Sequence, residues 1–243
     1  WRTVWQGIAI LIIFLLPLVI LNTIKSLNLD SREVDINPNK KKIRIKSWRR
    51  RDVIKDYRFY IVSLNMLAMP WMATGIFVYQ SFISDSKMWA IYTIPKAFMV
   101  YSITSIVTLF MSGFLVDKFT GRKLILYMNL PLLLAMFTLF QFNHEIFAYV
   151  FLGLIGVSNG LANILGSSTW AEIYGVRYIG SIKALTTAFM VFSTAFGTAV
   201  FGLLIDKGFS IENIAFVGGA YILISLVLLI LFRKTIEPVK LSK

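Results

Sequence analysis

Seven long apolar segments constrain what this chain can fold into. They cover approximately residues 3–22, 59–80, 89–112, 124–142, 146–168, 184–205 and 212–232. A helix needs roughly 20 residues to cross a bilayer core about 30 Å thick, and each segment is close to that length. Inside lipid, a helix satisfies its backbone hydrogen bonds within its own segment. The sequence therefore predicts an all-α, polytopic membrane helix bundle with seven transmembrane helices.

The composition excludes an ordinary soluble enzyme and a disordered chain. Hydrophobic residues make up 57% and charged residues 15% of the 243 positions, whereas a soluble domain has about a quarter of its residues charged. There is no cysteine and one histidine, His144, which we interpret as a solvated residue in a turn. No phosphate-binding loop, nucleophile elbow or metalloprotease motif occurs. The sequence thus predicts no catalytic residue, no cofactor and no metal site.

The net charge of +13 follows the predicted topology. Every Lys and Arg except Arg2, Lys87, Lys96 and Lys207 lies in a connection or tail that seven spans place on one side. The positive-inside rule puts that side in the cytoplasm, with the N-terminus outside. We therefore expect an integral protein of the plasma (cell inner) membrane and no binding of nucleic acid. The basic runs 40–46 and 48–52 fit either a solvated connector or a segment attracted to anionic lipid.

Polar residues inside the predicted spans are the candidate solute-binding residues, because such groups cost free energy in lipid unless they are paired or hydrated. Lys96 is either an anion-binding cation or a lysine whose side chain extends to the membrane surface. Asn159 and Asn163 are four residues apart and share one helix face. Asn65 and Gln80 lie in the second span. These four amides either line a cavity or form hydrogen bonds between helices.

The stretch GFLVDKFTGRK (113–123) resembles the signature loop G-x-x-x-D-[RK]-x-G-x-[RK]-[RK] of the major facilitator superfamily. The matching residues are Gly113, Asp117, Lys118, Arg122 and Lys123; Thr120 replaces the second glycine, and Gly121 follows it. Residues 168–208 and the second span are similar to later helices of the monocarboxylate and oxalate/formate-type branch of that family.

The resemblance implies that the seven spans correspond to helices six to twelve of a twelve-helix carrier. Residues 1–22 would be helix six, residues 23–58 the basic cytoplasmic linker, and residues 59–243 the C-terminal half. The chain begins with Trp1, so we expect it to be a C-terminal portion whose N-terminal half is a missing partner. The implied function is secondary transport of a small solute, such as an organic anion, by alternating access. A transport-inactive membrane scaffold and a seven-helix receptor are the alternatives.

The resemblance implies that the loop 113–123 forms part of a gate. Asp117 is expected to approach the start of the sixth span, near residues 181–183, where a helix N-terminus stabilises an anion. Arg122 and Arg177 are expected to pair with Glu172 and complete a latch. Organic-anion members of the branch often carry an arginine where this chain has Leu109. An anionic substrate is therefore predicted from Lys96 alone.

Overall fold

The computed structural model describes residues 2–26 and 47–237. The chain divides into two units, Trp1–Ile43 and Arg44–Lys243. The described part of the first unit is a single helix, α1 (Arg2–Ser26), with Pro17 inside it. The first apolar segment is therefore helical, as predicted. Most of the predicted linker, including the basic run 40–46, lies outside the described residues.

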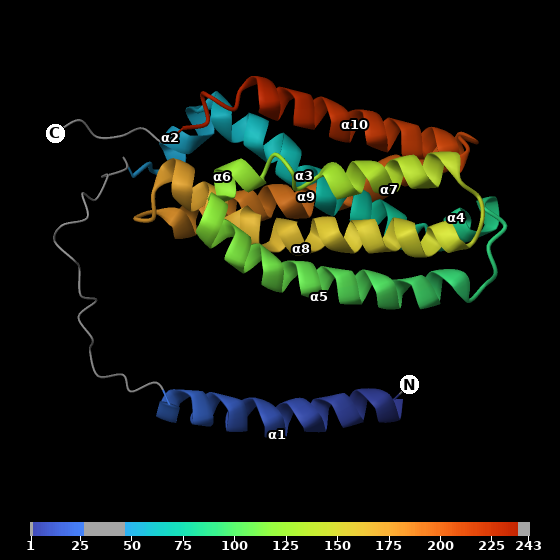
Figure 1. Cartoon of the computed structure of the whole chain (residues 1–243), viewed down its shortest axis with the longest axis horizontal. Coiled ribbons are helices and arrows are strands. Elements are labelled where there is room, and N and C mark those ends of the chain that lie inside the picture. The colour runs from blue at the N-terminus through green and yellow to red at the C-terminus, as the bar shows by residue number, and fades with distance from the viewer. Residues whose placement is uncertain (1, 27–46, 238–243) are drawn as a thin grey trace. The chain divides into compact units, whose positions relative to one another are not determined.

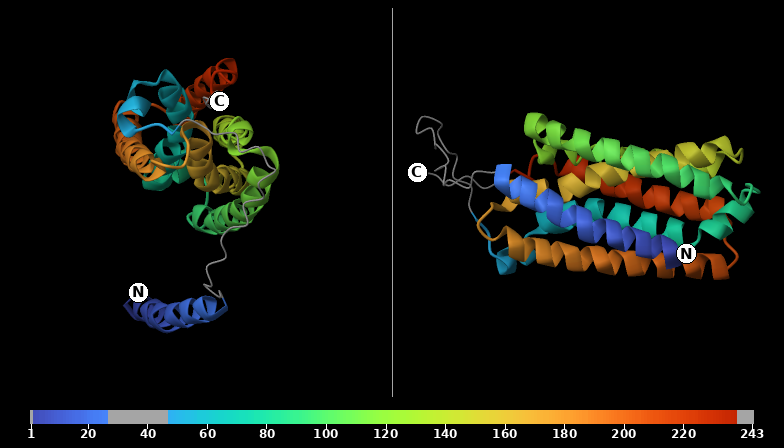
Figure 2. Two further views of the ribbon diagram at one scale, coloured as in Figure 1. Left: turned by 90° about the vertical axis from the view of Figure 1, so that its left-hand side faces the viewer. Right: turned by 90° about the horizontal axis from the view of Figure 1, so that it is seen from below.

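The second unit is a bundle of long helices joined by short connections (Figure 1). Its elements are α2 (Arg50–Lys55), α3 (Tyr57–Val78), α4 (Gln80–Ser86), α5 (Thr93–Phe119), α6 (Gly121–Leu124), α7 (Leu130–Gln141), α8 (Ile146–Tyr174), α9 (Ile179–Asp206) and α10 (Ile211–Leu231). Its long helices run along a common axis (Figure 2), and no strand occurs in the two described ranges. Helices α3, α5, α8, α9 and α10 are long and apolar enough to span a membrane. The all-α membrane bundle is confirmed.

The apolar segment 124–142 does not form one continuous helix. Helix α6 ends at Leu124 and α7 begins at Leu130, leaving α7 with 12 residues. Between them the amide of Tyr127 donates to the oxygen of Leu124 at 2.9 Å, the spacing of a tighter turn. Pro131 cannot donate the amide hydrogen bond that a continuous helix needs. The hydropathy of residues 124–142 predicted one continuous span and did not predict this break in the helix.

Helix α8 lies between α5 and α7 and packs most extensively on α5. Its glycines permit that contact, because small residues let two helices approach closely. A Cβ atom at Gly160 would lie 2.6 Å from the backbone oxygen of Ser105, and one at Gly156 would overlap the backbone oxygen of Tyr101. The hydroxyl of Thr104 donates to the backbone oxygen of Gly153 at 3.0 Å. The two helix backbones therefore approach too closely for larger side chains.

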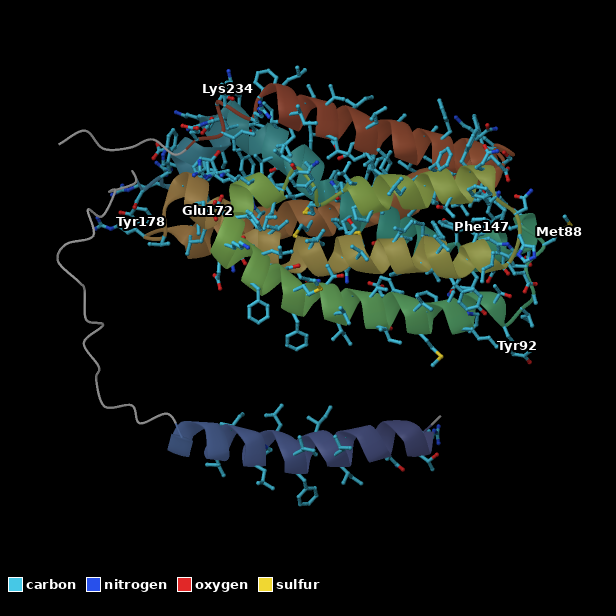
Figure 3. The ribbon with its side chains drawn as sticks, viewed as in Figure 1. Met88, Tyr92, Phe147, Glu172, Tyr178 and Lys234 are labelled. Carbon is cyan, nitrogen blue, oxygen red and sulfur yellow. The ribbon has the colours of Figure 1, made fainter. Side chains whose placement is uncertain are left out.

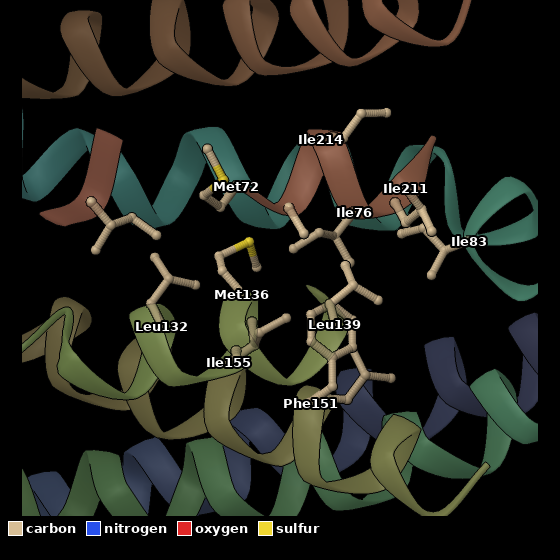
Figure 4. Packing of buried hydrophobic residues seen from close by; sticks show 14 of the residues in the cluster. Met72, Ile76, Ile83, Leu132, Met136, Leu139, Phe151, Ile155, Ile211 and Ile214 are labelled. Atoms are coloured by element: carbon tan, nitrogen blue, oxygen red, sulfur yellow. The ribbon is translucent and has the colours of Figure 1, made fainter. Parts of the chain in front are cut away.

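Two clusters of buried apolar side chains fill the bundle. One lies around the half of the bundle that carries α4 and includes Met72, Met136 and Phe151 (Figure 4). The other surrounds Phe59 and Trp170. Large apolar side chains also cover the outward faces, where α5 and α9 present many of the exposed phenylalanines. Such faces fit helices whose surroundings are lipid.

A buried lysine joins three connections at the end of the bundle that carries α4. The side chain of Lys87 is fully buried, and its Nζ donates to Asn143 Oδ1 and to Glu212 Oε1, both at 2.7 Å. The indole nitrogen of Trp89 donates to the backbone oxygen of Asn143 at 2.6 Å. Lys87 therefore ties the α4–α5 and α7–α8 connections to the start of α10, a role that sequence analysis did not assign to it.

A buried ion pair lies at the opposite end, where α3 begins. Arg58 Nη2 lies 2.7 Å from Asp56 Oδ2, and the two residues are only 9% and 8% exposed. The same carboxylate accepts a hydrogen bond from the hydroxyl of Tyr174 at 3.2 Å. Arg58 Nη1 also donates to the backbone oxygen of Glu237 at 3.0 Å. This network joins α3, the end of α8 and the segment after α10.

Candidate functional site

A cavity of about 310 Å³ lies between α3, α8 and α9. Its wall combines polar side chains from all three helices with methionines and aromatic rings. The polar residues are Ser63, Asn159, Asn163, Ser167, Lys183, Thr186 and Thr187. A few convergent polar groups on an apolar wall are typical of sites for small molecules, and unbranched methionine side chains adapt to varied ligand shapes.

Asn159 and Asn163 lie together in this cavity, on one face of α8. Asn159 Nδ2 donates to the hydroxyl of Ser105 at 2.9 Å, and Asn163 Nδ2 donates to the backbone oxygen of Asn159 at 2.9 Å. Neither side-chain oxygen accepts a hydrogen bond from the described residues. The sequence prediction that the two amides share a face is confirmed, and both amides have hydrogen-bonding capacity left for a solute.

Lys183 is the cation of the cavity, and sequence analysis assigned it to a cytoplasmic connection. Helix α9 begins at Ile179, five residues before the predicted span. That earlier start puts Lys183 on the helix, one turn before Thr186 and Thr187. Its Nζ forms no hydrogen bond or ion pair with the described part of the chain. The spacing of Lys183, Thr186, Thr187 and Met190 was the available signal, since residues three and four apart share a helix face.

The other three candidates lie outside the cavity. Asn65 is fully buried, and its backbone oxygen accepts a hydrogen bond from Asn129 Nδ2 at 2.5 Å. Gln80 is half-buried at the start of α4. Lys96 is exposed in the first turn of α5, because that helix begins at Thr93 rather than near Trp89. Of the five predicted solute-binding residues, the structure thus brings together Asn159 and Asn163.

Residues 113–123 were predicted to form a gate, and we call them the gate loop; they comprise the end of α5, Thr120 and the start of α6, and α6 packs against the end of α8. Figure 3 places Glu172 near the end of the bundle that carries Tyr178, away from Met88 and Tyr92. One oxygen of the Glu172 carboxylate accepts a hydrogen bond from the amide of Gly121 at 2.6 Å. The other accepts the amide of Arg122 at 3.1 Å and its Nε at 3.3 Å. The predicted Arg122–Glu172 ion pair is therefore present.

The other contacts predicted for the gate loop are absent from the described residues. Asp117 is exposed, and no hydrogen bond or ion pair joins it to the start of α9. Arg177 lies over the ring of Tyr178, with its guanidinium carbon 5.5 Å from the centroid, instead of pairing with Glu172. Helix α5 uses its inner face to pack on α8, which leaves Asp117 on the outer face. Glu172 instead accepts hydrogen bonds from the backbone amides at the start of α6.

The remaining residues of the motif do not contact α8 in this way. Lys118 is exposed and lies over the ring of Phe119, with Nζ 5.4 Å from the centroid. Lys123 is exposed as well. A Cβ atom at Gly113 would meet no atom of the described chain. Packing within this bundle therefore does not require glycine at position 113.

Comparison with known proteins tests the resemblance to the major facilitator superfamily. A family model described as the Major Facilitator Superfamily matches residues 60–243. The match spans nearly all of α3 and every helix from α4 to α10, including the cavity and the gate loop. The chain belongs to the major facilitator superfamily. Members of this superfamily are membrane secondary transporters and not enzymes. Secondary transport is the general function that the sequence predicted. No curated protein matches the chain.

Thr120 occupies the position of the second glycine in the major facilitator motif. Its backbone has φ +71° and ψ +144°, a region that residues other than glycine rarely adopt. The next residue also requires glycine, since a Cβ atom at Gly121 would lie 2.7 Å from the hydroxyl oxygen of Ser168. Two consecutive positions of the gate loop thus favour glycine, and the chain has glycine at one of them.

Replacing Thr120 with glycine should stabilise the protein by about 1 kcal/mol. Removing the Cβ atom relieves strain of about 1–3 kcal/mol, which the greater freedom of glycine in the unfolded chain partly offsets. The measurement is the unfolding temperature in detergent. Thr198→Gly is the control, because Thr198 lies inside α9, where glycine is less favourable than threonine by about 0.3 kcal/mol. If Thr120→Gly lowers the unfolding temperature as Thr198→Gly does, the strain at Thr120 is refuted.

Proposed function

We propose that this chain is the C-terminal portion of a twelve-helix carrier that moves a small organic anion across the plasma membrane by alternating access. The cavity between α3, α8 and α9 is the part of the solute site that this portion contributes. A monocarboxylate is the proposed substrate class, in keeping with the resemblance to the monocarboxylate and oxalate/formate-type branch. The remaining half of the carrier is the proposed partner of this bundle.

One observation about Lys183 carries this proposal. Its ammonium group borders the cavity and has no partner within the described residues. A carboxylate binds an ammonium group through charge-assisted hydrogen bonds. The unused oxygens of Asn159 and Asn163 are acceptors for a hydroxyl group of the solute. Trp170 and the methionines present an apolar wall to its carbon chain. At about 310 Å³, the cavity suits a small solute.

The gate of this carrier is proposed to lie at the end of the bundle that bears Lys183. The Arg122–Glu172 pair at this end is the proposed latch, which would hold the gate loop against α8 until the gate opens. Many basic residues gather at the same end, including Lys118, Lys123 and Arg233. The positive-inside rule supports a cytoplasmic location for this end, and so for the linker and the C-terminus.

Uptake by the intact carrier in proteoliposomes tests the proposal, with formate, oxalate, lactate and pyruvate as labelled solutes. Lys183→Gln should lower kcat/KM for the transported carboxylate by about 10–100-fold, the value of a hydrogen bond to a charged group. Lys207→Gln is the matched control. Lys207 is also an exposed lysine, and it follows α9 at the far end of that helix; its substitution should leave uptake unchanged.

Three outcomes would contradict parts of this proposal. Equal uptake by the parent and Lys183→Gln would remove Lys183 from the site. A loss confined to Lys96→Gln would move the anion site to the start of α5. Failure of the intact carrier to move any solute would favour the transport-inactive scaffold.

A further inference from the structure

A second cavity opens at the end of the bundle that carries the gate loop, between α5, α6 and the end of α10. Its volume is about 720 Å³, and we call it the basic groove. It is separate from the solute cavity, because no residue lines both. Any ligand of the basic groove would therefore contact none of the residues that line the solute cavity.

Cations dominate the polar side chains of the basic groove. Arg122, Lys123, Arg233 and Lys234 line it, against a single carboxylate, that of Glu237. Arg122 is engaged with Glu172, while Lys123, Arg233 and Lys234 are exposed and their side chains form no hydrogen bond or ion pair with other described residues. Four cations brought together on one groove repel one another. An anion bound among them would remove that repulsion.

Apart from Thr120, the rest of the basic groove is mostly apolar, and it lies where two candidate membrane spans end. Leu115 belongs to α5 and Leu229 to α10, both of which are membrane spans. Both spans end close by, at Phe119 and Leu231. Phe119 is 44% exposed and Tyr127 is 60% exposed at this level, where aromatic side chains favour the boundary between lipid and water. The groove thus offers cations at headgroup depth and leucines at acyl-chain depth.

We propose that the basic groove binds one anionic glycerophospholipid from the leaflet that contacts this end of the bundle. Its phosphate lies among Lys123, Arg233 and Lys234, and part of an acyl chain covers Leu115 and Leu124. Basic pockets between spanning helices recognise lipid headgroups in this way. A free phosphate would satisfy the cations and leave the apolar floor uncovered, so the whole groove fits a lipid better than a soluble anion.

Native mass spectrometry of the full chain, purified in a non-ionic detergent, tests this proposal. The probes are phosphatidylglycerol and phosphatidylcholine with the same acyl chains. We expect one tightly retained phosphatidylglycerol and no comparable retention of phosphatidylcholine. Each basic residue near an anionic lipid strengthens binding about fivefold, so the variant K123Q/R233Q/K234Q should weaken it by on the order of 100-fold. Arg122 is left intact, because its pair with Glu172 holds the gate loop.

The matched control is R50Q/R51Q/K55Q, which removes three exposed cations from α2 at the same end of the bundle. The control should retain phosphatidylglycerol, and both variants should keep the parent's unfolding temperature in detergent without added lipid. Equal losses in the two variants would indicate diffuse attraction to the surface and overturn the proposal. Displacement of phosphatidylglycerol by glycerol 3-phosphate would identify a soluble-anion site and also overturn it. Neither result depends on transport, so this test is independent of the solute site.

Discussion

Replacing Gly156 with leucine is expected to separate α5 from α8 and to lower the unfolding temperature by about 10 °C. A Cβ atom there would overlap Thr104 Oγ1 and the backbone oxygen of Tyr101. The α5 backbone cannot avoid the new side chain without leaving α8, and this is the most extensive helix contact in the bundle. Overpacking against a backbone costs about 3 kcal/mol. Tryptophan fluorescence during heating in detergent measures the change.

Gly166→Leu provides a matched control for this prediction. Gly166 lies in the same helix, but a Cβ atom there would meet no atom within 4 Å. The substitution removes a glycine from a helix interior, so it should leave stability unchanged or raise it by up to about 1 kcal/mol. If both leucine variants unfold at the same temperature, close approach of α5 and α8 does not stabilise this bundle.

Replacing Asp56 with alanine is expected to destabilise the protein by about 4 kcal/mol. Removing one partner of a buried ion pair leaves the other charge uncompensated, which costs about 3–5 kcal/mol. Asp56 also caps α3, because Oδ1 accepts the amide of Arg58 at 3.1 Å, and it accepts the hydroxyl of Tyr174. Chemical unfolding in mixed micelles gives the free energy of unfolding for this comparison.

Two further variants establish the cause of that loss. Asp52→Ala removes an exposed carboxylate that accepts one amide, that of Arg49 at 3.2 Å, so it should cost about 1 kcal/mol or less. The double variant D56A/R58M removes both buried charges and should recover much of the stability lost in D56A. A double variant as unstable as the sum of its two single variants would mean that the ion pair does not stabilise the junction of α3 and α8.

Sequence patterns predicted the features of this fold that each helix determines for itself. The spans now seen as α3, α5, α8, α9 and α10 follow from length and hydropathy, because a spanning helix makes its backbone hydrogen bonds internally. The shared face of Asn159 and Asn163 follows from the helical repeat. The Arg122–Glu172 pair was predicted from the charged residues at this end of the spans, and the Major Facilitator Superfamily model matches the region that contains it.

Features that depend on two or more helices were predicted poorly. Lys96 lies in an apolar segment and was predicted to be either an anion-binding cation or a lysine that extends to the membrane surface; it is exposed in the first turn of α5. Lys183 was assigned to a connection and nevertheless lines the cavity. The two lysines differ in how their helices are rotated and where those helices begin. Neither property can be read from the hydropathy of a segment, which is the same whichever way the helix is rotated.

The sequence by itself determined that this chain is a membrane bundle and where most of its spans lie, since the bilayer requires each span to satisfy its backbone locally. It did not determine which side chains meet across the helices. Only the tertiary structure united Lys183 with Asn159, buried Lys87 against Glu212, and gathered Lys123 with Lys234 in the basic groove. These arrangements depend on how the packed helices are rotated and how deep each one sits, which the hydropathy of a single segment does not specify.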